Sequence, residues 1–131
     1  MSDEDWRDLI NALRDSDDGA CLAAAAARLH KTATAEDLQR LLDLLKDDDF
    51  FVREAAAWPV SELAGPSALR ELLLAYQRGI DEGHDNDGFA TALIGVVEKD
   101  KSTSRQMLRA LADDTNPTMR ENSLWLLEFC S

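Results

Sequence analysis

Few side chains in this sequence could do covalent or metal chemistry, and they are scattered along the chain. Of the two histidines, only His84 lies beside a carboxylate, Asp85. Imidazole and carboxylate are suitable ligands for a divalent transition metal, so this dipeptide is the strongest candidate for a hydrolytic site. Cys130 has no histidine near it, and serine, cysteine and histidine are too dispersed to indicate a catalytic triad. The sequence also lacks a glycine-rich phosphate loop.

Two separated histidines, a His-Asp pair and a later aspartate in a helical protein resemble the HD-type metal phosphohydrolases. The resemblance implies a metal held by His30, His84, Asp85 and either Asp113 or Asp114. The chain departs from that family because its His-Asp pair lies between Gly83 and Asn86, where we expect a turn and the family has a helix. We therefore keep a metal phosphohydrolase as an alternative, and predict no catalytic residue, metal or cofactor.

The turn around His84 also resembles part of a calcium-binding loop, through Asp85, Asp87 and Gly88. However, Gly83 stands where a coordinating side chain is needed, and Ile94 stands where the closing glutamate belongs. We predict instead that one of residues 85–87 caps the next helix, and that Gly83 adopts a positive φ.

Composition and charge narrow the classes of fold and partner. The length predicts one domain over residues 1–131, and abundant alanine and leucine with three prolines favour an all-α protein. The net charge of −12 argues against nucleic acid, which needs clustered lysine and arginine, and favours a basic protein partner. Two cysteines and an acidic N-terminus predict a reduced, cytoplasmic location. No apolar run reaches the roughly 18 residues that span a bilayer, so we expect no membrane contact.

Hydrophobic periodicity and capping residues predict about eight helices. They are expected over residues 3–14, 19–30, 34–45, 50–63, 67–80, 88–98 and 104–112, and from residue 116 onwards. The clearest start signals are Thr34 with Asp37 in a capping box and Asn116 followed by Pro117. Pro59 is expected to kink the fourth helix.

Two segments 67 residues apart carry the same residues in the same order. Val52-Arg53-Glu54 with Trp58 is matched by Met119-Arg120-Glu121 with Trp125, and each segment follows an acidic turn. An offset of this size suits two helical hairpins of about 33 residues each, so we predict an α-solenoid of four hairpins.

The acidic turn followed by Val-Arg or Met-Arg and small apolar residues resembles HEAT repeats, best over residues 48–56 and 113–120. The first and third hairpins lack the equivalent arginine, so their assignment rests on helix periodicity. The resemblance implies a structural ladder of turn aspartates and arginines, formed by Asp47 or Asp48 with Arg53 and by Asp114 with Arg120.

Stacked hairpins would place all four internal turns along one edge of the molecule. The turns contain no lysine or arginine and hold twelve acidic side chains: Asp15, Asp17, Asp18, Asp47, Asp48, Asp49, Asp81, Glu82, Asp85, Asp87, Asp113 and Asp114. Some of them would cap helices. We expect the others to attract a cationic partner.

Trp58 and Trp125 are expected at equivalent places, about 120° from the core stripe of their helices. They would either pack between adjacent repeats or serve as aromatic anchors for a partner on the concave face. The last helix is apolar in nearly every direction, which is unusual for a solenoid end, through Leu124, Trp125, Leu126, Leu127 and Phe129. A preceding repeat, a second copy of the chain or a partner could cover it.

Small acidic HEAT-like proteins of this sort resemble bacterial immunity proteins, which neutralise a toxin. The resemblance implies a non-enzymatic module that binds a basic protein partner. We predict the contact residues Asp48, Asp49, Asp85, Asp87, Trp58, Trp125 and Glu121. A regulatory scaffold that forms a homodimer through the C-terminal helix is a second hypothesis, beside the metal phosphohydrolase. HEAT-like DNA glycosylases are disfavoured because a basic surface is missing.

Overall fold

The computed structural model describes residues 1–15 and 17–130, and every regular element in these ranges is helical. The all-α class is therefore confirmed. The α-helices are α1 (Asp3–Asp15), α2 (Gly19–Thr32), α3 (Leu38–Leu44), α4 (Phe50–Ala64), α5 (Leu69–Asp81), α6 (Asp87–Lys99), α7 (Lys101–Leu111) and α8 (Pro117–Leu127). Short 3-10 turns precede α3 and α5 and follow α8: η1 (Ala35–Asp37), η2 (Gly65–Ala68) and η3 (Glu128–Cys130).

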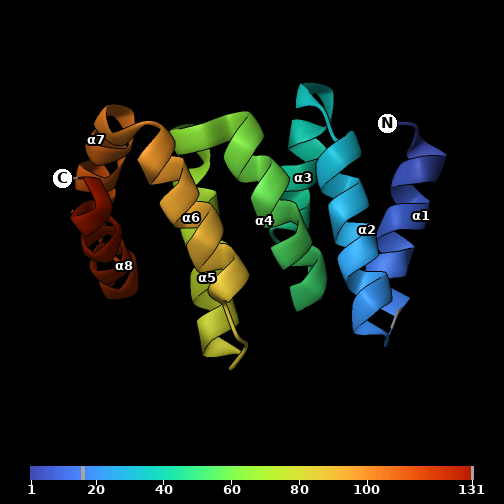
Figure 1. Ribbon diagram of the computed structural model, residues 1–131. Helices are drawn as coiled ribbons and strands as arrows, with labels where there is room; N and C mark the ends of the chain where they lie inside the picture. Colours follow the sequence, from blue (N-terminus) through green and yellow to red (C-terminus); the bar gives the residue numbers. More distant parts are fainter. Residues whose placement is uncertain (16, 131) are drawn as a thin grey trace.

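Consecutive helices pack in pairs, and the pairs lie side by side from the N-terminus to the C-terminus (Figure 1). Within this arrangement α4 is central, because it contacts α2 on one side and α6 on the other, as well as its pair partner α3. An ion pair of 3.1 Å between Asp3 and Arg40 joins the starts of α1 and α3. Helices α2, α4 and α6 thus form a row that presents one face of the molecule.

Local capping determines where several helices begin. Asn116 accepts hydrogen bonds from the amides of Thr118 (2.9 Å) and Met119 (3.2 Å), so the predicted start of α8 is confirmed. The capping box of Thr34 and Asp37 is also present. Helix α7 begins three residues earlier than expected, because Asp100 accepts a hydrogen bond from the Thr103 amide at 3.1 Å.

The turn before α6 follows only part of its prediction. Gly83 has a φ of 81°, as expected. Asn86 stands at the N-cap of α6, but its side-chain amide donates to the Tyr76 carbonyl at 2.8 Å instead of capping the helix. Asp85 accepts a hydrogen bond from the Asp87 amide at 3.0 Å and so stabilises the turn.

The core is one continuous cluster of apolar side chains that extends from α1 to η3. Helix α4 contributes heavily to it, since Val52, Ala56 and Val60 are completely buried. At the C-terminal end, Leu126 is also completely buried, and Trp125, Leu127 and Phe129 pack against the core, whereas Leu124 remains 57% exposed. The preceding helices therefore cover most of the apolar surface of α8. No described helix is long and apolar enough to cross a membrane.

Candidate functional site

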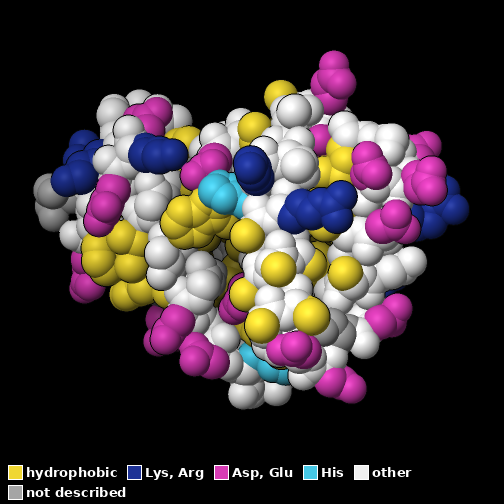
Figure 2. Space-filling model, turned by 45° about the vertical axis from the view of Figure 1, so that its right-hand side comes forward, with side chains coloured by type: hydrophobic (Ala, Val, Ile, Leu, Met, Phe, Trp, Pro, Cys, Tyr) yellow, Lys and Arg dark blue, Asp and Glu magenta, His cyan; other side chains and the backbone are white. Residues whose placement is uncertain are grey.

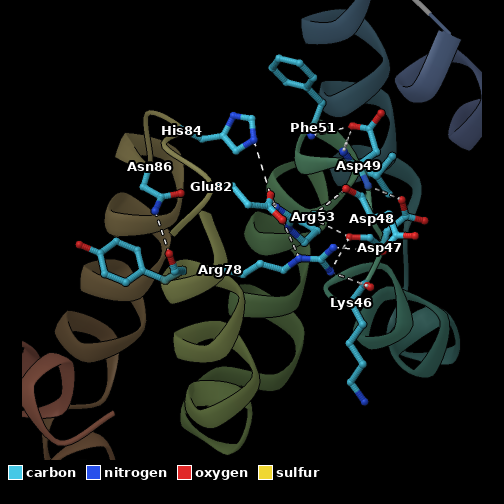
Figure 3. Close-up of polar contacts among 12 residues, drawn as sticks. Lys46, Asp47, Asp48, Asp49, Phe51, Arg53, Arg78, Glu82, His84 and Asn86 are labelled. Atoms are coloured by element: carbon cyan, nitrogen blue, oxygen red, sulfur yellow. Dashed lines mark hydrogen bonds and ion pairs between the residues drawn. The ribbon is translucent and has the colours of Figure 1, made fainter. Parts of the chain in front are cut away.

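Arg53 links two turns that are distant in sequence. Its side chain is completely buried, and Nη1 donates to the carbonyl oxygens of Asp47 (2.8 Å) and Asp48 (3.1 Å). Nη2 pairs with Oε1 of Glu82 at 2.5 Å (Figure 3). Arg53 thus contacts the aspartates named by the HEAT resemblance, but it binds their main-chain oxygens, and its carboxylate partner comes from the next turn.

The carboxylates of this turn have other partners within the chain. Asp47 pairs with Arg14 of α1, and Asp48 pairs with Arg78 of α5 at 3.1 Å. Arg78 also binds Glu82 at 3.0 Å. Hydrogen bonds from Arg53, which has the larger effect, and from Arg78 hold the pKa of Glu82 below its ordinary value.

The third aspartate of the same turn, Asp49, caps α4 by accepting from the Phe51 amide at 2.8 Å. All three aspartates of this turn therefore have contacts within the chain, although the Asp48 side chain remains fully exposed. Asp48 and Asp49 stay predicted partner contacts, and Asp49 also caps α4.

The fourth turn does not lie at the same edge as the third. Arg120 donates to the carbonyl oxygens of Asp114 (2.9 Å) and Thr115 (3.1 Å), as Arg53 does in its own turn. However, the Asp114 carboxylate pairs with Arg70 at the start of α5, at 2.9 Å. Glu82 follows the other end of α5, about 18 Å away at 1.5 Å per helical residue. The expected edge of four aligned turns is therefore wrong for the fourth turn.

A groove of about 430 Å³ runs between α2 and α4. Small side chains of α2, including Ala23, Ala26 and Ala27, line one side of it, and Phe51 and Trp58 of α4 line the other. Both aromatic side chains are accessible, since Phe51 is 50% and Trp58 is 42% exposed. Figure 2 shows a strip of hydrophobic side chains on this face, between the two cyan histidines.

One end of the groove contains His30 beside Trp58, with ring centroids 5.6 Å apart in an edge-on contact. Both residues bind Glu62 of α4: His30 Nε2 lies 2.8 Å from Oε2, and Trp58 Nε1 donates to Oε1 at 3.0 Å. The hydrogen bond from His30 lowers the pKa of Glu62. These contacts fix the orientation of the exposed Trp58 ring.

The other end opens into a pocket that shares Phe51 and Glu54 with the groove. Its remaining lining residues are Phe50, His84, Asp85, Asp87 and Gly88. The His84 ring stacks on Phe50, with centroids 4.2 Å apart and planes at 7°. We call Arg53 and its contacts with Asp47, Asp48 and Glu82 the Arg53 ladder. Figure 3 shows that the side chains of Phe51 and His84 project on the same side of this ladder. We call the pocket itself the acidic pocket.

Trp125 has a different environment from Trp58. It stacks on Tyr76 of α5, with centroids 5.5 Å apart and planes at 9°, and it contacts Phe129 edge-on at 5.8 Å. It therefore packs between α5 and α8, one of its two predicted positions, and the structure does not bring it into the groove with Trp58. Glu121 is exposed on α8, also outside the groove.

The residues implied by the phosphohydrolase resemblance are not gathered in one place. His30 contacts Trp58 and Glu62, whereas His84 stacks on Phe50. Within residues 1–15 and 17–130, no group of three or more histidine, cysteine or acidic side chains is placed to hold a metal ion.

Sequence reasoning missed Glu54 and the alanine side of the groove. The run of alanines in α2 indicated close helix packing, but Ala23 and Ala27 are exposed and border the groove. The sequence signal was limited to the alanine run at residues 23–27, because only the structure shows that Phe51 is exposed and lies across from it. No protein-family model, curated protein or solved structure matches this chain.

Proposed function

We propose that the chain is a non-enzymatic protein-binding module that holds a segment of a basic protein in the groove between α2 and α4. The main support is that Phe51 and Trp58 of α4 are exposed and line the groove across from small side chains of α2. Burying accessible aromatic side chains in a partner interface contributes much of the binding energy in protein complexes. The alanines leave room for larger side chains of the partner.

The charge of the surface supports a basic partner. The chain carries a net charge of −12, and the acidic pocket at the end of the groove is lined by Glu54, Asp85 and Asp87. Such a field speeds the approach of a cationic protein and selects against acidic competitors. The segment in the groove therefore combines apolar side chains along α2 with at least one cationic side chain at the acidic pocket.

We assign the fold to an α-solenoid of four HEAT-like hairpins made of about eight helices. Support comes from the pairwise packing of consecutive helices and from the matching arginine contacts of Arg53 and Arg120. With this scaffold and charge, the module acts as a bacterial immunity-type protein that keeps a basic toxin inactive. Its two free cysteines, Cys21 and Cys130, suit action in the reducing cytoplasm.

The test is capture of a partner with four baits in parallel: the wild-type chain, Ala23→Gln, Ala24→Gln and Phe51→Ala. Ala23 borders the groove, whereas Ala24 is exposed on the same helix outside it, so the two glutamine variants form a matched pair. We expect one basic protein to be retained by the wild type and Ala24→Gln and lost by Ala23→Gln and Phe51→Ala. Equal retention by all four baits would contradict the proposal.

A homodimer through α8 is the second candidate, because Leu124 is 57% exposed on that helix. Light scattering over a range of concentrations tests it directly. A mass that rises from monomer to dimer in the wild type, but not in Leu124→Lys, would support this candidate. A monomer mass at every concentration would exclude it.

A further inference from the structure

The acidic pocket differs from the neighbouring acidic turns in how its charges are compensated. In the turns, Asp47, Asp48 and Glu82 each pair with an arginine of this chain. The pocket is lined by Glu54, Asp85 and Asp87 and by no lysine or arginine. The fold therefore supplies arginines to one set of carboxylates, whereas the adjacent set faces a cavity in which His84 is, among the described lining residues, the one side chain that can carry a positive charge.

Glu54 is the least solvated of the three carboxylates. Burial, and next the charge of Asp85, raise the pKa of Glu54 above its ordinary value. Helix α6 begins directly against this side chain: a Cβ atom on Gly88 would lie 3.0 Å from the Glu54 carboxyl carbon. Glycine at this position thus lets the carboxylate sit close to the α6 backbone at the pocket wall. A cation in the pocket would offset the cost of desolvation and reduce the repulsion between the carboxylates.

The other walls of the pocket are aromatic, and the rings accessible to a ligand are those of His84 and Phe51, because Phe50 is only 7% exposed and is contacted by both His84 and Arg53. Phe50 and His84 form a parallel stack, and Phe51 stands at the boundary with the groove, half exposed. A guanidinium group is planar, is weakly hydrated, stacks on aromatic faces and donates paired hydrogen bonds to carboxylates. A compact, strongly hydrated ammonium group uses such walls less well.

We propose that the acidic pocket receives the guanidinium group of an arginine side chain from the basic partner. The arginine enters beside Phe51, its plane lies along the aromatic wall, and its N–H groups donate to Glu54 and to Asp85 or Asp87. The apolar part of the same partner segment continues into the groove along α2. In this arrangement Glu54 helps the pocket to bind arginine in preference to lysine, a role that the sequence alone did not indicate.

The experiment is a titration of the ¹⁵N-labelled chain with N-acetyl-L-arginine amide, followed by NMR chemical shifts. The control ligand is N-acetyl-L-citrulline amide, which has nearly the same shape without the charge, and N-acetyl-L-lysine amide is the third ligand. We expect saturable shifts centred on residues 50–54 and 84–88 with the arginine derivative. Binding should be about tenfold weaker with the other two ligands.

Two variants and one control locate the effect. Glu54→Gln removes the charge at nearly constant shape, and Gly88→Ala keeps the charge but displaces the carboxylate; both should weaken arginine binding about tenfold. Glu98→Gln removes one negative charge near the other end of α6, about 15 Å from Gly88 at 1.5 Å per helical residue, and should leave binding unchanged. Circular dichroism verifies that each variant is folded.

Three results would overturn the assignment: equal binding of citrulline or lysine derivatives, shifts that avoid residues 50–54, or equal effects of Glu54→Gln and Glu98→Gln. The inference rests on the proposed function, because the arginine comes from the partner. The titration uses a free amino-acid derivative, so its failure overturns only the assignment of arginine to the acidic pocket. Capture of the partner through the α2 side of the groove is tested separately by Ala23→Gln. Failure of capture with a positive titration would instead overturn the proposed function.

Discussion

The buried guanidinium of Arg53 in α4 pairs with the Glu82 carboxylate, which follows α5, at 2.5 Å. The same guanidinium donates to the carbonyl oxygens of Asp47 and Asp48, so one side chain fastens two turns that are distant in sequence. Because Glu54 follows Arg53 on α4, the ladder also fixes the first turn of α4 beside α6, where the acidic pocket lies. The Arg53 contacts must therefore stay intact for the acidic pocket to keep its shape.

Replacing Arg53 with methionine should lower the free energy of unfolding by roughly 3 kcal/mol, because two part-buried carbonyl oxygens lose a donor and Glu82 keeps, among the described residues, only Arg78 as a hydrogen-bond donor. Arg120→Met is the matched variant, since Arg120 makes the same two kinds of carbonyl contact from a half-buried position. It should cost clearly less. Urea unfolding followed by circular dichroism measures both, and an equal cost for the two variants would show that burial and Glu82 add nothing at Arg53.

Substitutions of Trp58 and Trp125 should affect different quantities: Trp58 mainly the affinity for the partner, and Trp125 mainly the free energy of unfolding. Trp125→Ala removes the stack on Tyr76 and should lower the free energy of unfolding by roughly 2–3 kcal/mol, with little effect on partner affinity. Trp58→Ala should lower stability by less than about 1 kcal/mol and weaken partner binding. Thermal unfolding and calorimetric titration with the captured partner give the two quantities. The reverse pattern would place the binding surface on α8.

Glu54 and Glu82 should respond to pH with opposite signs. Burial raises the pKa of Glu54, so its ionisation opposes folding increasingly as the pH rises from its ordinary value of 4.5 through the raised value. Hydrogen bonds from Arg53 and Arg78 lower the pKa of Glu82, so its ionised form contributes stability that is lost as the pH falls through the lowered value.

Glu54→Gln should therefore be more stable than the wild type at about pH 7, and Glu82→Gln should be less stable. Both differences should shrink as the solution is acidified to about pH 4. Urea unfolding at the two pH values checks the sign of each. A destabilised Glu54→Gln at neutral pH would mean that a cation of this chain already compensates Glu54.

Asp85 should matter more for association with the basic partner than Asp48. Asp48 is already paired with Arg78, whereas Asp85 lines the acidic pocket. Asp85→Lys should slow association several-fold, and the effect should fade between about 50 and 300 mM salt because screening shortens the range of the field. Stopped-flow measurement with the captured partner tests this. Equal slowing by Asp48→Lys would favour a diffuse charge effect over the pocket.

Local features of the fold could be read from the sequence because they depend on neighbouring residues. Asn116 with Pro117, and Thr34 with Asp37, begin helices as predicted, since capping needs only a side-chain oxygen and nearby amides. The contact between Arg53 and its own turn likewise follows from a spacing of five to six residues.

Features that depend on the packing of whole helices were not predicted. Arg70 binds Asp114, which puts the fourth turn at the start of α5, and nothing local to either residue determines that approach. The turn sequences also do not show which charges are compensated, since the arginines that pair with Asp47 and Asp48 belong to α1 and α5. The groove was not predicted because a run of alanines indicates close helix packing, whereas Ala23, Ala26 and Ala27 of α2 line an open groove.

Hydrogen–deuterium exchange on the purified complex with the captured basic protein tests most directly whether the partner occupies the groove between α2 and α4. Exchange is compared for the free chain and the complex, and again for Ala23→Gln and Ala24→Gln. We predict new protection in residues 19–30, 50–58 and 84–88 that Ala24→Gln retains and Ala23→Gln loses. Protection confined to α7 and α8, with the α2 and α4 peptides unchanged, would contradict the account.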